Sequence, residues 1–288
     1  MAGDPALDPA LFAHRNPTSI AAFARIFGPF ARTWFRYTLR GLERLPPPPC
    51  LVVGNHSGFG TYEIPCMISA WTQQLGTDRP VHGLAHESGL RIPIWGRWER
   101  EMGALPASRE TALVALRAGR DVMVFPGGEA DACRPVYHAR RVVFGKRRGY
   151  ARLALEAGVP IVPLATIGSH YTVPMAPGGT TLARLLGLKR LMRLETVPLP
   201  IGWITAVAAL GGTVTGHLPV VLGGLVATAG LLPVPARITS EFLAPIDVSA
   251  ATANLPEDAR VEAAHELVYS ALSAAVATMK HEPTQAAT

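Results

Sequence analysis

The chain has 288 residues, of which 49% are hydrophobic and 17% are charged, and its mean hydropathy is +0.22. A charged fraction of about 25% is usual, so this composition excludes a disordered chain, a coiled coil and an acidic tail, and it favours a protein that works beside lipid. The net charge of +6 favours an anionic partner, either phospholipid, a phosphorylated metabolite or nucleic acid. Because the sequence has no zinc-finger spacing and no RNP-like aromatic motif, we expect no nucleic-acid partner.

An amphipathic helix is predicted near the amino terminus, within residues 20–45. Its aromatic and apolar side chains recur at helical spacing beside arginines, a pattern typical of a helix lying on an anionic membrane surface. The pattern equally fits a helix packed on the domain, but the arginines are too dense for a segment that crosses a bilayer. Prolines 46–49 should end this helical region. The residues concerned are Phe23, Ile26, Phe27, Phe30, Trp34 and Tyr37, with Arg25, Arg32, Arg36 and Arg40.

Strands and helices alternate through the middle of the chain, which predicts an α/β domain with a mixed central sheet flanked by helices. Ser108 is the expected N-cap of one helix, and Pro256-Glu257 should open a carboxyl-terminal helix. We therefore divide the chain into an amino-terminal helix region (1–45), an α/β domain (46–250), and a carboxyl-terminal helix and tail (251–288). Strands are expected at 51–54, 81–85, 121–125, 159–167 and 236–243, and helices at 63–75, 111–118 and 150–157.

A strongly apolar insertion occupies residues 196–236, which contain no Asp, Glu, Lys or Arg. Prolines and glycines divide it into two pieces, 201–214 and 218–232. Each piece has about 15 residues and reaches ~22 Å at ~1.5 Å per residue, which is short of a ~30 Å hydrocarbon core. We favour a hydrophobic hairpin that dips into one leaflet or covers an acyl pocket, over a full crossing or an ordinary buried hairpin.

The most informative cluster is residues 54–63, which follow a predicted strand and open a helix. His56 stands in a loop at a strand end, a usual place for a catalytic group, and a neutral imidazole can take a proton from an attacking hydroxyl. Glu63 is the nearest carboxylate that could fix its tautomer. In a continuous helix the two residues would lie ~10 Å apart along the axis, so the glycines must bend the loop for them to meet. The alternative is a loop histidine without a role.

Two further features follow the predicted strand at 121–125. The amides of Gly127 and Gly128 could hold an oxyanion or a phosphate, although a plain turn is the alternative. A basic run then spans residues 134–152, which contain no acid. Such a run usually forms a solvated face, but its place after a possible anion-binding loop makes phosphate binding or membrane contact at least as well supported.

Five blocks stand in order along the chain: Asn55-His56-Ser57-Gly58 through Glu63, Gly103-Ala104-Leu105-Pro106 with Arg109, Phe125-Pro126-Gly127-Gly128, Lys146-Arg147-Arg148-Gly149-Tyr150, and Val159-Pro160-Ile161-Val162-Pro163. Together they resemble the glycerolipid and lysophospholipid acyltransferase superfamily over about residues 35–250, and its diacylglycerol-acyltransferase-like branch most of all. Two departures stand out. Thr61 occupies the place of the usual Asp, and the usual Phe-Pro-Glu-Gly block has Gly127 in third place, with Glu129 displaced.

The resemblance implies an O-acyltransferase that moves a fatty acyl group from acyl-CoA, or acyl carrier protein, to a hydroxyl of a glycerolipid or lysophospholipid. It implies that His56 is the general base, that Glu63 orients it, and that neither a metal nor a cofactor is needed beyond the acyl donor. The oxyanion or phosphate site would be Gly127 and Gly128, and the substrate-binding residues would be Arg109, Glu129, Lys146, Arg147 and Arg148.

The hydrophobic excess then has a purpose, because the acyl chain and the acceptor both reside in a bilayer. We expect a peripheral or monotopic protein on the cytoplasmic face of a membrane, since three scattered cysteines suit a reducing compartment. Two alternatives remain. A lipid hydrolase would use the same histidine with water, but the chain lacks the Gly-x-Ser-x-Gly elbow. A non-catalytic lipid-binding membrane scaffold would not need His56.

Overall fold

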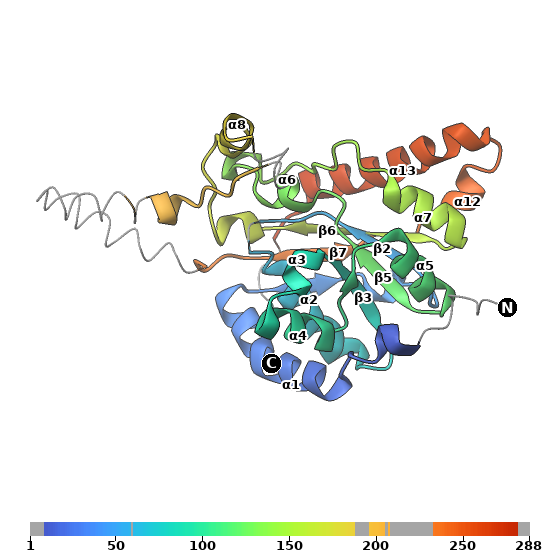
Figure 1. Ribbon diagram of the computed structural model, residues 1–288, viewed down its shortest axis with the longest axis horizontal. Helices are drawn as coiled ribbons and strands as arrows, with labels where there is room; N and C mark the ends of the chain where they lie inside the picture. Colours follow the sequence, from blue (N-terminus) through green and yellow to red (C-terminus); the bar gives the residue numbers. More distant parts are fainter. Residues whose placement is uncertain (1–8, 59, 188–195, 205–206, 208–232, 282–288) are drawn as a thin grey trace, which may run out of the picture.

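Seven strands form one sheet in the order β1-β7-β6-β2-β5-β3-β4 (Figure 1). The computed structural model describes residues 9–58, 60–187, 196–204, 207 and 233–281. Neighbouring strands run parallel except β6 and β7, which pair antiparallel, so the predicted mixed sheet is confirmed. The strands are β1 (Thr38–Arg40), β2 (Leu51–Gly54), β3 (Val81–Ala85), β4 (Leu105–Pro106), β5 (Asp121–Val124), β6 (Ile161–Ile167) and β7 (Thr239–Phe242).

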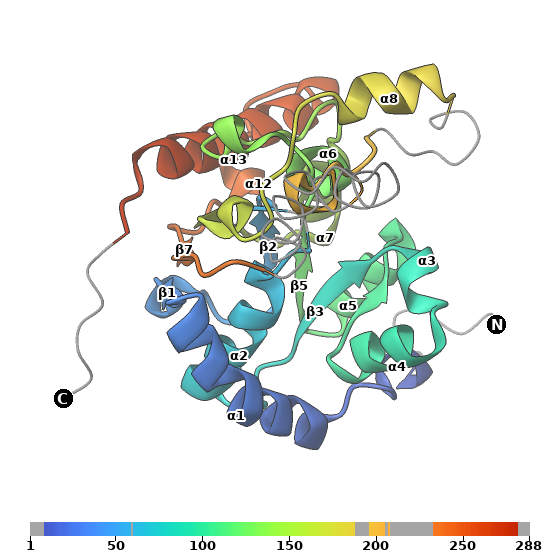
Figure 2. The same cartoon turned by 90° about the vertical axis from the view of Figure 1, so that its left-hand side faces the viewer.

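Helices cover both faces of this sheet (Figures 1 and 2). Helices α1 and α2 pack against each other on one face, while α5, α7 and α13 pack together on the other, with α13 against β6. The described helices are α1 (Pro17–Trp34), α2 (Glu63–Leu75), α3 (Glu87–Leu90), α4 (Pro93–Glu101), α5 (Arg109–Arg117), α6 (Gly128–Ala132), α7 (Gly149–Ala157), α8 (Gly179–Leu185), α12 (Val248–Ala251) and α13 (Glu257–Thr278).

The central strand β2 shows why the sequence signal for this sheet was strong. All four of its residues are buried. Leu51 and Val53 join the core under α5, α7 and α13, whereas Val52 joins the core under α1 and α2. Successive side chains of a strand point to opposite faces, so a parallel strand covered on both sides is apolar at every position. The predicted span 51–54 is confirmed.

The first helix is shorter than predicted. Asn16 caps α1 by accepting hydrogen bonds from the amides of Thr18 and Ser19, and the helix ends at Trp34. Beyond it, Phe35 is fully buried and Arg36 takes a left-handed conformation with φ of 41°, which helices do not continue through. Residues 38–40 then form β1, paired with β7 at the sheet edge. The expectation of a helical region up to the prolines is therefore wrong.

The segment between β3 and β5 holds elements that the sequence patterns did not indicate. Short helices α3 and α4 and the two-residue strand β4 lie there, before α5 and its predicted cap, Ser108, which accepts a hydrogen bond from Thr111 N. Most of the predicted apolar hairpin, 201–232, lies outside the described residues, although 201–204 form one helical turn. Within the described ranges, no helix combines the length and the apolar character that a membrane crossing requires.

Candidate active site

His56 and Phe125 follow neighbouring parallel strands at the centre of the sheet. Val53 of β2 is paired with Val124 of β5, so the chain leaves both strands side by side. The Phe125 ring stacks on the His56 imidazole with 4.5 Å between ring centroids and 15° between planes. Gly54 makes room for this ring, because a Cβ there would lie 2.6 Å from it. The site thus stands at the carboxyl edge of the parallel strands, where ligands usually bind.

The loop between β2 and α2 brings His56 and Glu63 together, as the spacing required. Gly60 has a φ of 82°, and Glu63 is the first residue of α2. His56 Nδ1 lies 3.1 Å from Glu63 Oε1. Because an ionised carboxylate only accepts hydrogen bonds, this contact favours the neutral tautomer with its proton on Nδ1, in which Nε2 keeps its lone pair. This is the geometry of a general base with an orienting carboxylate.

Glu63 is almost completely buried, at 2% exposure, and its carboxylate is held by other donors as well. Ser57 N donates to Oε1 at 3.1 Å, and Ser169 Oγ donates to Oε2 at 2.8 Å. Gly58 lies so close to the segment after β6 that a Cβ there would be 2.5 Å from Ser169 O. Ser169 is therefore a positioning residue that sequence reasoning missed, and its only signal is its place just beyond a strand end.

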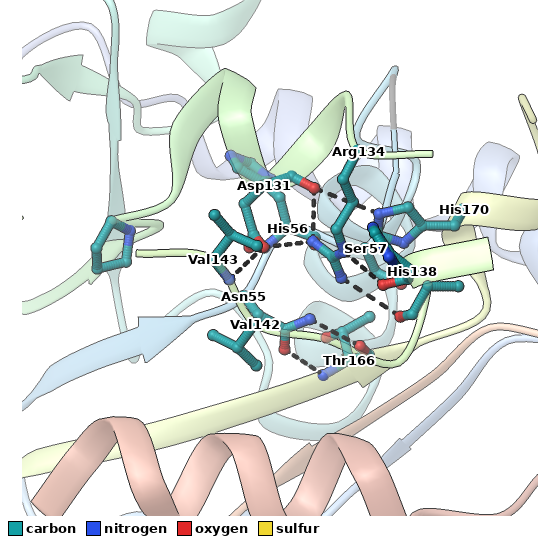
Figure 3. A network of polar contacts seen from close by, with 12 residues as sticks. Asn55, His56, Ser57, Asp131, Arg134, His138, Val142, Val143, Thr166 and His170 are labelled. Atoms are coloured by element: carbon teal, nitrogen blue, oxygen red, sulfur yellow. Dashed lines mark hydrogen bonds and ion pairs between the residues drawn. The ribbon is translucent and has the colours of Figure 1, made fainter. Parts of the chain in front are cut away.

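A buried ion pair anchors the backbone of His56 (Figure 3). Asp131 Oδ2 accepts a hydrogen bond from His56 N at 2.7 Å, and Asp131 Oδ1 accepts one from Val143 N at 2.9 Å while also pairing with Arg134. Arg134 Nη1 donates in turn to His56 O at 3.1 Å. Burial raises the pKa of the Asp131 carboxyl to about 6, whereas Arg134 and the two amides favour its ionised form. Both peptide groups of His56 are thus fixed.

The same loop is tied to β6 through Asn55. Its Nδ2 donates to Thr166 O at 2.9 Å, and its Oδ1 accepts from Thr166 N at 2.8 Å. Beside this anchor, His170 is 1% exposed, and its Nε2 donates to Asp131 O at 3.3 Å. Burial lowers the pKa of His170 to about 3, so this second histidine is neutral at physiological pH. Hydrogen bonds and an ion pair thus connect the backbone of His56 and its neighbours to α6 and β6 (Figure 3).

Two hollows of opposite chemistry meet at Phe125, whose side chain lines both. The first, which we call the apolar cavity, has a volume of about 220 Å³. The second, which we call the arginine cleft, has a volume of about 590 Å³ and is lined by Arg109, Arg147, Arg148 and Arg152. The walls of the apolar cavity come from α2, β3 and α4 and include Met67, Ile68, Trp71, Leu84, Trp95, Trp98 and Met102.

Three of the predicted substrate-binding residues lie together in the arginine cleft. Arg109 is paired with Glu156, and Arg148 makes a two-pronged pair with Glu262 at 2.8 and 2.9 Å. Arg147 donates from Nη1 to the carbonyl oxygen of the loop residue Pro126 at 2.9 Å.

The basic run divides differently from the prediction. Lys146 is exposed and stands outside the cleft, while Arg152 lines it. Arg134, at the start of the run, is buried against Asp131 rather than solvated.

The loop after β5 needs a glycine at position 128, because its backbone conformation and a neighbouring side chain leave no room for a Cβ. Gly128 has a φ of 50°, and a Cβ there would lie 2.5 Å from Arg147 Nη1. Its amide donates to Phe125 O at 3.1 Å and closes a turn. Of the two predicted anion-binding amides, we therefore retain that of Gly127. Glu129 stands in the first turn of α6, next to this loop.

Comparison with known proteins agrees with the sequence blocks. Residues 36–167 match the family model described as Acyltransferase. This part of the chain contains β1 to β6 and both members of the His56–Glu63 pair.

Relatives of the chain point the same way. An uncharacterized protein of Mycobacterium tuberculosis is 29% identical over 66% of this chain and 53% of its own length. Two proteins named "DGAT1/2-independent enzyme synthesizing storage lipids" also match. The one from Gallus gallus is 27% identical over 60% of this chain and 49% of its own length. The one from Homo sapiens is 30% identical, with 57% and 49% covered. The chain spans about half the length of the curated relatives it matches.

Among solved structures, the crystal structure of the 1-acyl-sn-glycerophosphate acyltransferase PlsC from Thermotoga maritima is similar, with a TM-score of 0.49 and 16% identity. The alignment covers 88% of this chain and 79% of that one.

Proposed function

We propose that the protein is a membrane-associated O-acyltransferase that moves a fatty acyl group from acyl-CoA, or acyl carrier protein, to a hydroxyl of a glycerolipid or lysophospholipid. One observation carries the proposal: the imidazole of His56, which is paired with Glu63, is stacked on Phe125, and Phe125 lines both the apolar cavity and the arginine cleft. An acyl chain is apolar, and CoA, the carrier-protein prosthetic group and phospholipids all bear phosphate. The two hollows therefore suit the two kinds of substrate surface.

The reaction follows from the orientation of the imidazole. His56 Nε2 takes the proton of the acceptor hydroxyl as that oxygen attacks the acyl carbonyl carbon. Glu63 holds Nδ1–H and stabilises the imidazolium that forms. The thioester C–S bond then breaks, an ester C–O bond remains, and the imidazolium returns its proton to the leaving thiolate. We assign the negative charge on the carbonyl oxygen to the amide of Gly127. Protons and electrons balance without another reactant.

Phosphate binding is assigned to the arginine cleft. Arg152 is an exposed residue in the wall of the cleft. Arg147 also lines the cleft, and its hydrogen bond to Pro126 O connects the cleft to the glycine loop. Guanidinium groups bind phosphate in a two-pronged manner, and the pairs of Arg109 and Arg148 with glutamates can exchange for such contacts. Of the other predicted binding residues, Glu129 lies beside the loop and Lys146 outside the cleft, so neither has a place in this assignment.

Membrane association of the peripheral or monotopic kind is assigned first to α1. This helix exposes Ile26, Phe30 and Trp34 and has exposed Arg25 and Arg32. Its first turn contains no acid, and its sequence has no Asp or Glu at all. Apolar burial combined with attraction to anionic headgroups, roughly 1 kcal/mol per basic residue near the surface, would hold such a helix on a bilayer.

The experiment is an acceptor panel. Wild-type protein receives acyl-CoA labelled in the acyl group together with diacylglycerol or one of several lysophospholipids, and mass spectrometry identifies the products. We expect a labelled ester from the wild type and from the surface control His14→Ala, and none above background from His56→Ala. Labelled free fatty acid in place of ester would establish a lipid hydrolase. Failure of a folded wild-type protein to consume any donor would leave a lipid-binding scaffold.

A further inference from the structure

The segment between β3 and β4 ends in an exposed apolar tip, formed by Ile92, Ile94 and Trp95 where α3 meets α4. Their exposures are 53%, 88% and 51%. Single exposed apolar residues are ordinary, but three within four positions make a patch of the kind that binds a partner or a membrane. The corner that carries them is closely packed, because a Cβ on Gly96 would lie 2.1 Å from Leu90 O.

This tip borders the apolar cavity. Trp95 is half exposed and also lines the cavity, so it stands at an opening of that cavity to the surface. One turn further along α4, Trp98 lines the same cavity, and its ring lies 5.0 Å from that of Trp95. The cavity also includes Phe125, the residue stacked on His56. The cavity therefore extends from Trp95 at the tip to Phe125, the residue that contacts His56.

The charges that flank the tip are paired with each other. Arg91 contacts Glu87 at 2.6 Å, and Arg97 contacts Glu101 at 3.0 Å. The tip therefore offers an apolar surface with little net charge around it, unlike α1 with its exposed arginines. A surface of this kind is complementary to hydrocarbon and not to an acidic partner.

Exposed apolar side chains also occur on α1 and α8. In Figure 2, α1 lies at the lower edge, α3 and α4 at the right and α8 above. The exposed residues are Ile26, Phe30 and Trp34 on α1, with Leu185 and Leu186 at the end of α8. Insertion of several such apolar groups is typical of proteins that bind a bilayer surface.

We propose that Ile92, Ile94 and Trp95 insert into the hydrocarbon layer of a lipid membrane and open the apolar cavity directly to it. A lipid chain then passes between bilayer and cavity beside Trp95 without crossing water. The identity of that chain as substrate rests on the proposed function. The insertion itself does not depend on acyl transfer.

Flotation with neutral phosphatidylcholine vesicles at 1 M salt tests the insertion, because the screening length there is about 3 Å and the attraction of exposed arginines is suppressed. Ile94→Ser removes one inserted isoleucine and should lower the partition coefficient of the protein onto vesicles by roughly 10-fold or more. Leu267→Ser, at a residue of α13 that is also exposed, is the matched control and should bind as the wild type does. Ile92→Ser should reproduce the loss, and circular dichroism checks the fold of each variant.

Equal flotation of Ile94→Ser and wild type would overturn the proposal. It would also be overturned if light scattering showed a dimer that Ile94→Ser dissociates, because the tip would then be covered by a second copy of the chain. A second assay separates this proposal from the proposed function. With short-chain donor and acceptor dissolved below their micellar concentrations, Ile94→Ser should keep the wild-type kcat, while its rate on a vesicle-borne acceptor falls in step with flotation. Vesicle binding through the tip without any acyl transfer would refute only the proposed function.

Discussion

The two hollows that meet at Phe125 differ in almost every physical respect. The apolar cavity is walled mainly by large hydrophobic side chains of α2, β3 and α4, whereas the arginine cleft is lined by residues at the starts of α5 and α7 and by the loops before them. Leu84 and Phe125 line both hollows, and the imidazole of His56 is stacked on Phe125. Both hollows therefore border a residue that contacts His56.

The contrast indicates how one edge of a sheet could bind amphipathic substrates. Transfer of hydrocarbon out of water is favourable by about 0.8 kcal/mol per CH₂, whereas phosphate is bound by charge-assisted hydrogen bonds. Under the proposed function, each part of the substrates would bind in the hollow whose chemistry matches it. Substitutions can remove the base His56, remove the carboxylate of Glu63 that orients it, and fill each hollow separately.

Removal of the shared base should have the largest effect. In His56→Ala no group remains to take the hydroxyl proton, and loss of a positioned base typically lowers kcat by ~10²–10⁴-fold. Steady-state rates with labelled acyl-CoA measure this loss, and unchanged binding of substrates to either hollow should accompany it. A variant that keeps more than half of the wild-type kcat would rule out His56 as the base.

Loss of the orienting carboxylate should rank second. In Glu63→Gln the amide cannot stabilise the imidazolium, so kcat should fall by roughly 10–10³-fold while KM changes less. Ser169→Ala removes only the 2.8 Å bond to Oε2 and should cause a smaller fall in kcat. Thr61→Ala is the control, since Thr61 occupies the position of the usual acid. A larger loss in Thr61→Ala than in Glu63→Gln would move the orienting role away from Glu63.

The two hollows can be filled separately by a matched pair of substitutions. Gly83 lines the apolar cavity and Gly149 lines the arginine cleft, and a Cβ at either would meet no atom within 4 Å in the described structure. Gly83→Leu should lower kcat/KM for long acyl chains by roughly 4-fold per displaced methylene, since each is worth about 0.8 kcal/mol. Gly149→Leu should instead raise KM for the phosphate-bearing substrate at every chain length. Identical chain-length profiles for the two variants would show that the hollows do not sort the substrates.

The smallest expected effect concerns stability and not catalysis. His82 of β3 is fully buried, and its Nε2 accepts from Arg120 Nη1 at 3.3 Å while Nδ1 donates to Gly103 O at 2.8 Å. Burial lowers the pKa of His82 to about 4. The unfolded chain, with a histidine pKa of about 6.5, therefore binds the proton first on acidification. Stability from this group is complete above pH 6.5 and is lost as pH falls toward 4.

Urea unfolding of wild type and His82→Gln at several pH values isolates that contribution. The difference in unfolding free energy should shrink by about 1–2 kcal/mol between pH 7 and pH 5. A difference that is constant or grows over this range would contradict the neutral, hydrogen-bonded state of His82.

The predictable parts of the fold and the site are those determined by residues that are close together in the sequence. Strand β2 and the loop after it were readable because an apolar run, glycines and a histidine stand next to each other. The His56–Glu63 contact was a hypothesis that required the glycines to bend the loop, and the structure shows such a bend with Gly60 at a φ of 82°. The resemblance in five ordered blocks then implied a role for the pair, and the family match over 36–167 includes both residues.

The remaining parts depend on contacts between distant positions. Ser169 reaches Glu63 across 106 positions, and nothing near this serine distinguishes it from any other. Arg134 looked like the start of a solvated basic run, but Asp131 three residues earlier makes it a buried anchor. Helix α1 stops at Trp34 because the Phe35 side chain fits the core, which periodicity cannot reveal. The apolar tip between α3 and α4 was hidden by its shortness.

Product stoichiometry is the decisive measurement for acyl transfer from a thioester to a lipid hydroxyl at His56. Wild-type protein is given acyl-CoA labelled in the acyl group and a lysophospholipid acceptor, and free thiol and labelled ester are counted in the same sample. We expect the wild-type protein to release one thiol for each labelled ester formed, and we expect both products to decrease together in His56→Ala. Thiol release accompanied by labelled free fatty acid, or ester formation that persists in His56→Ala, would contradict it.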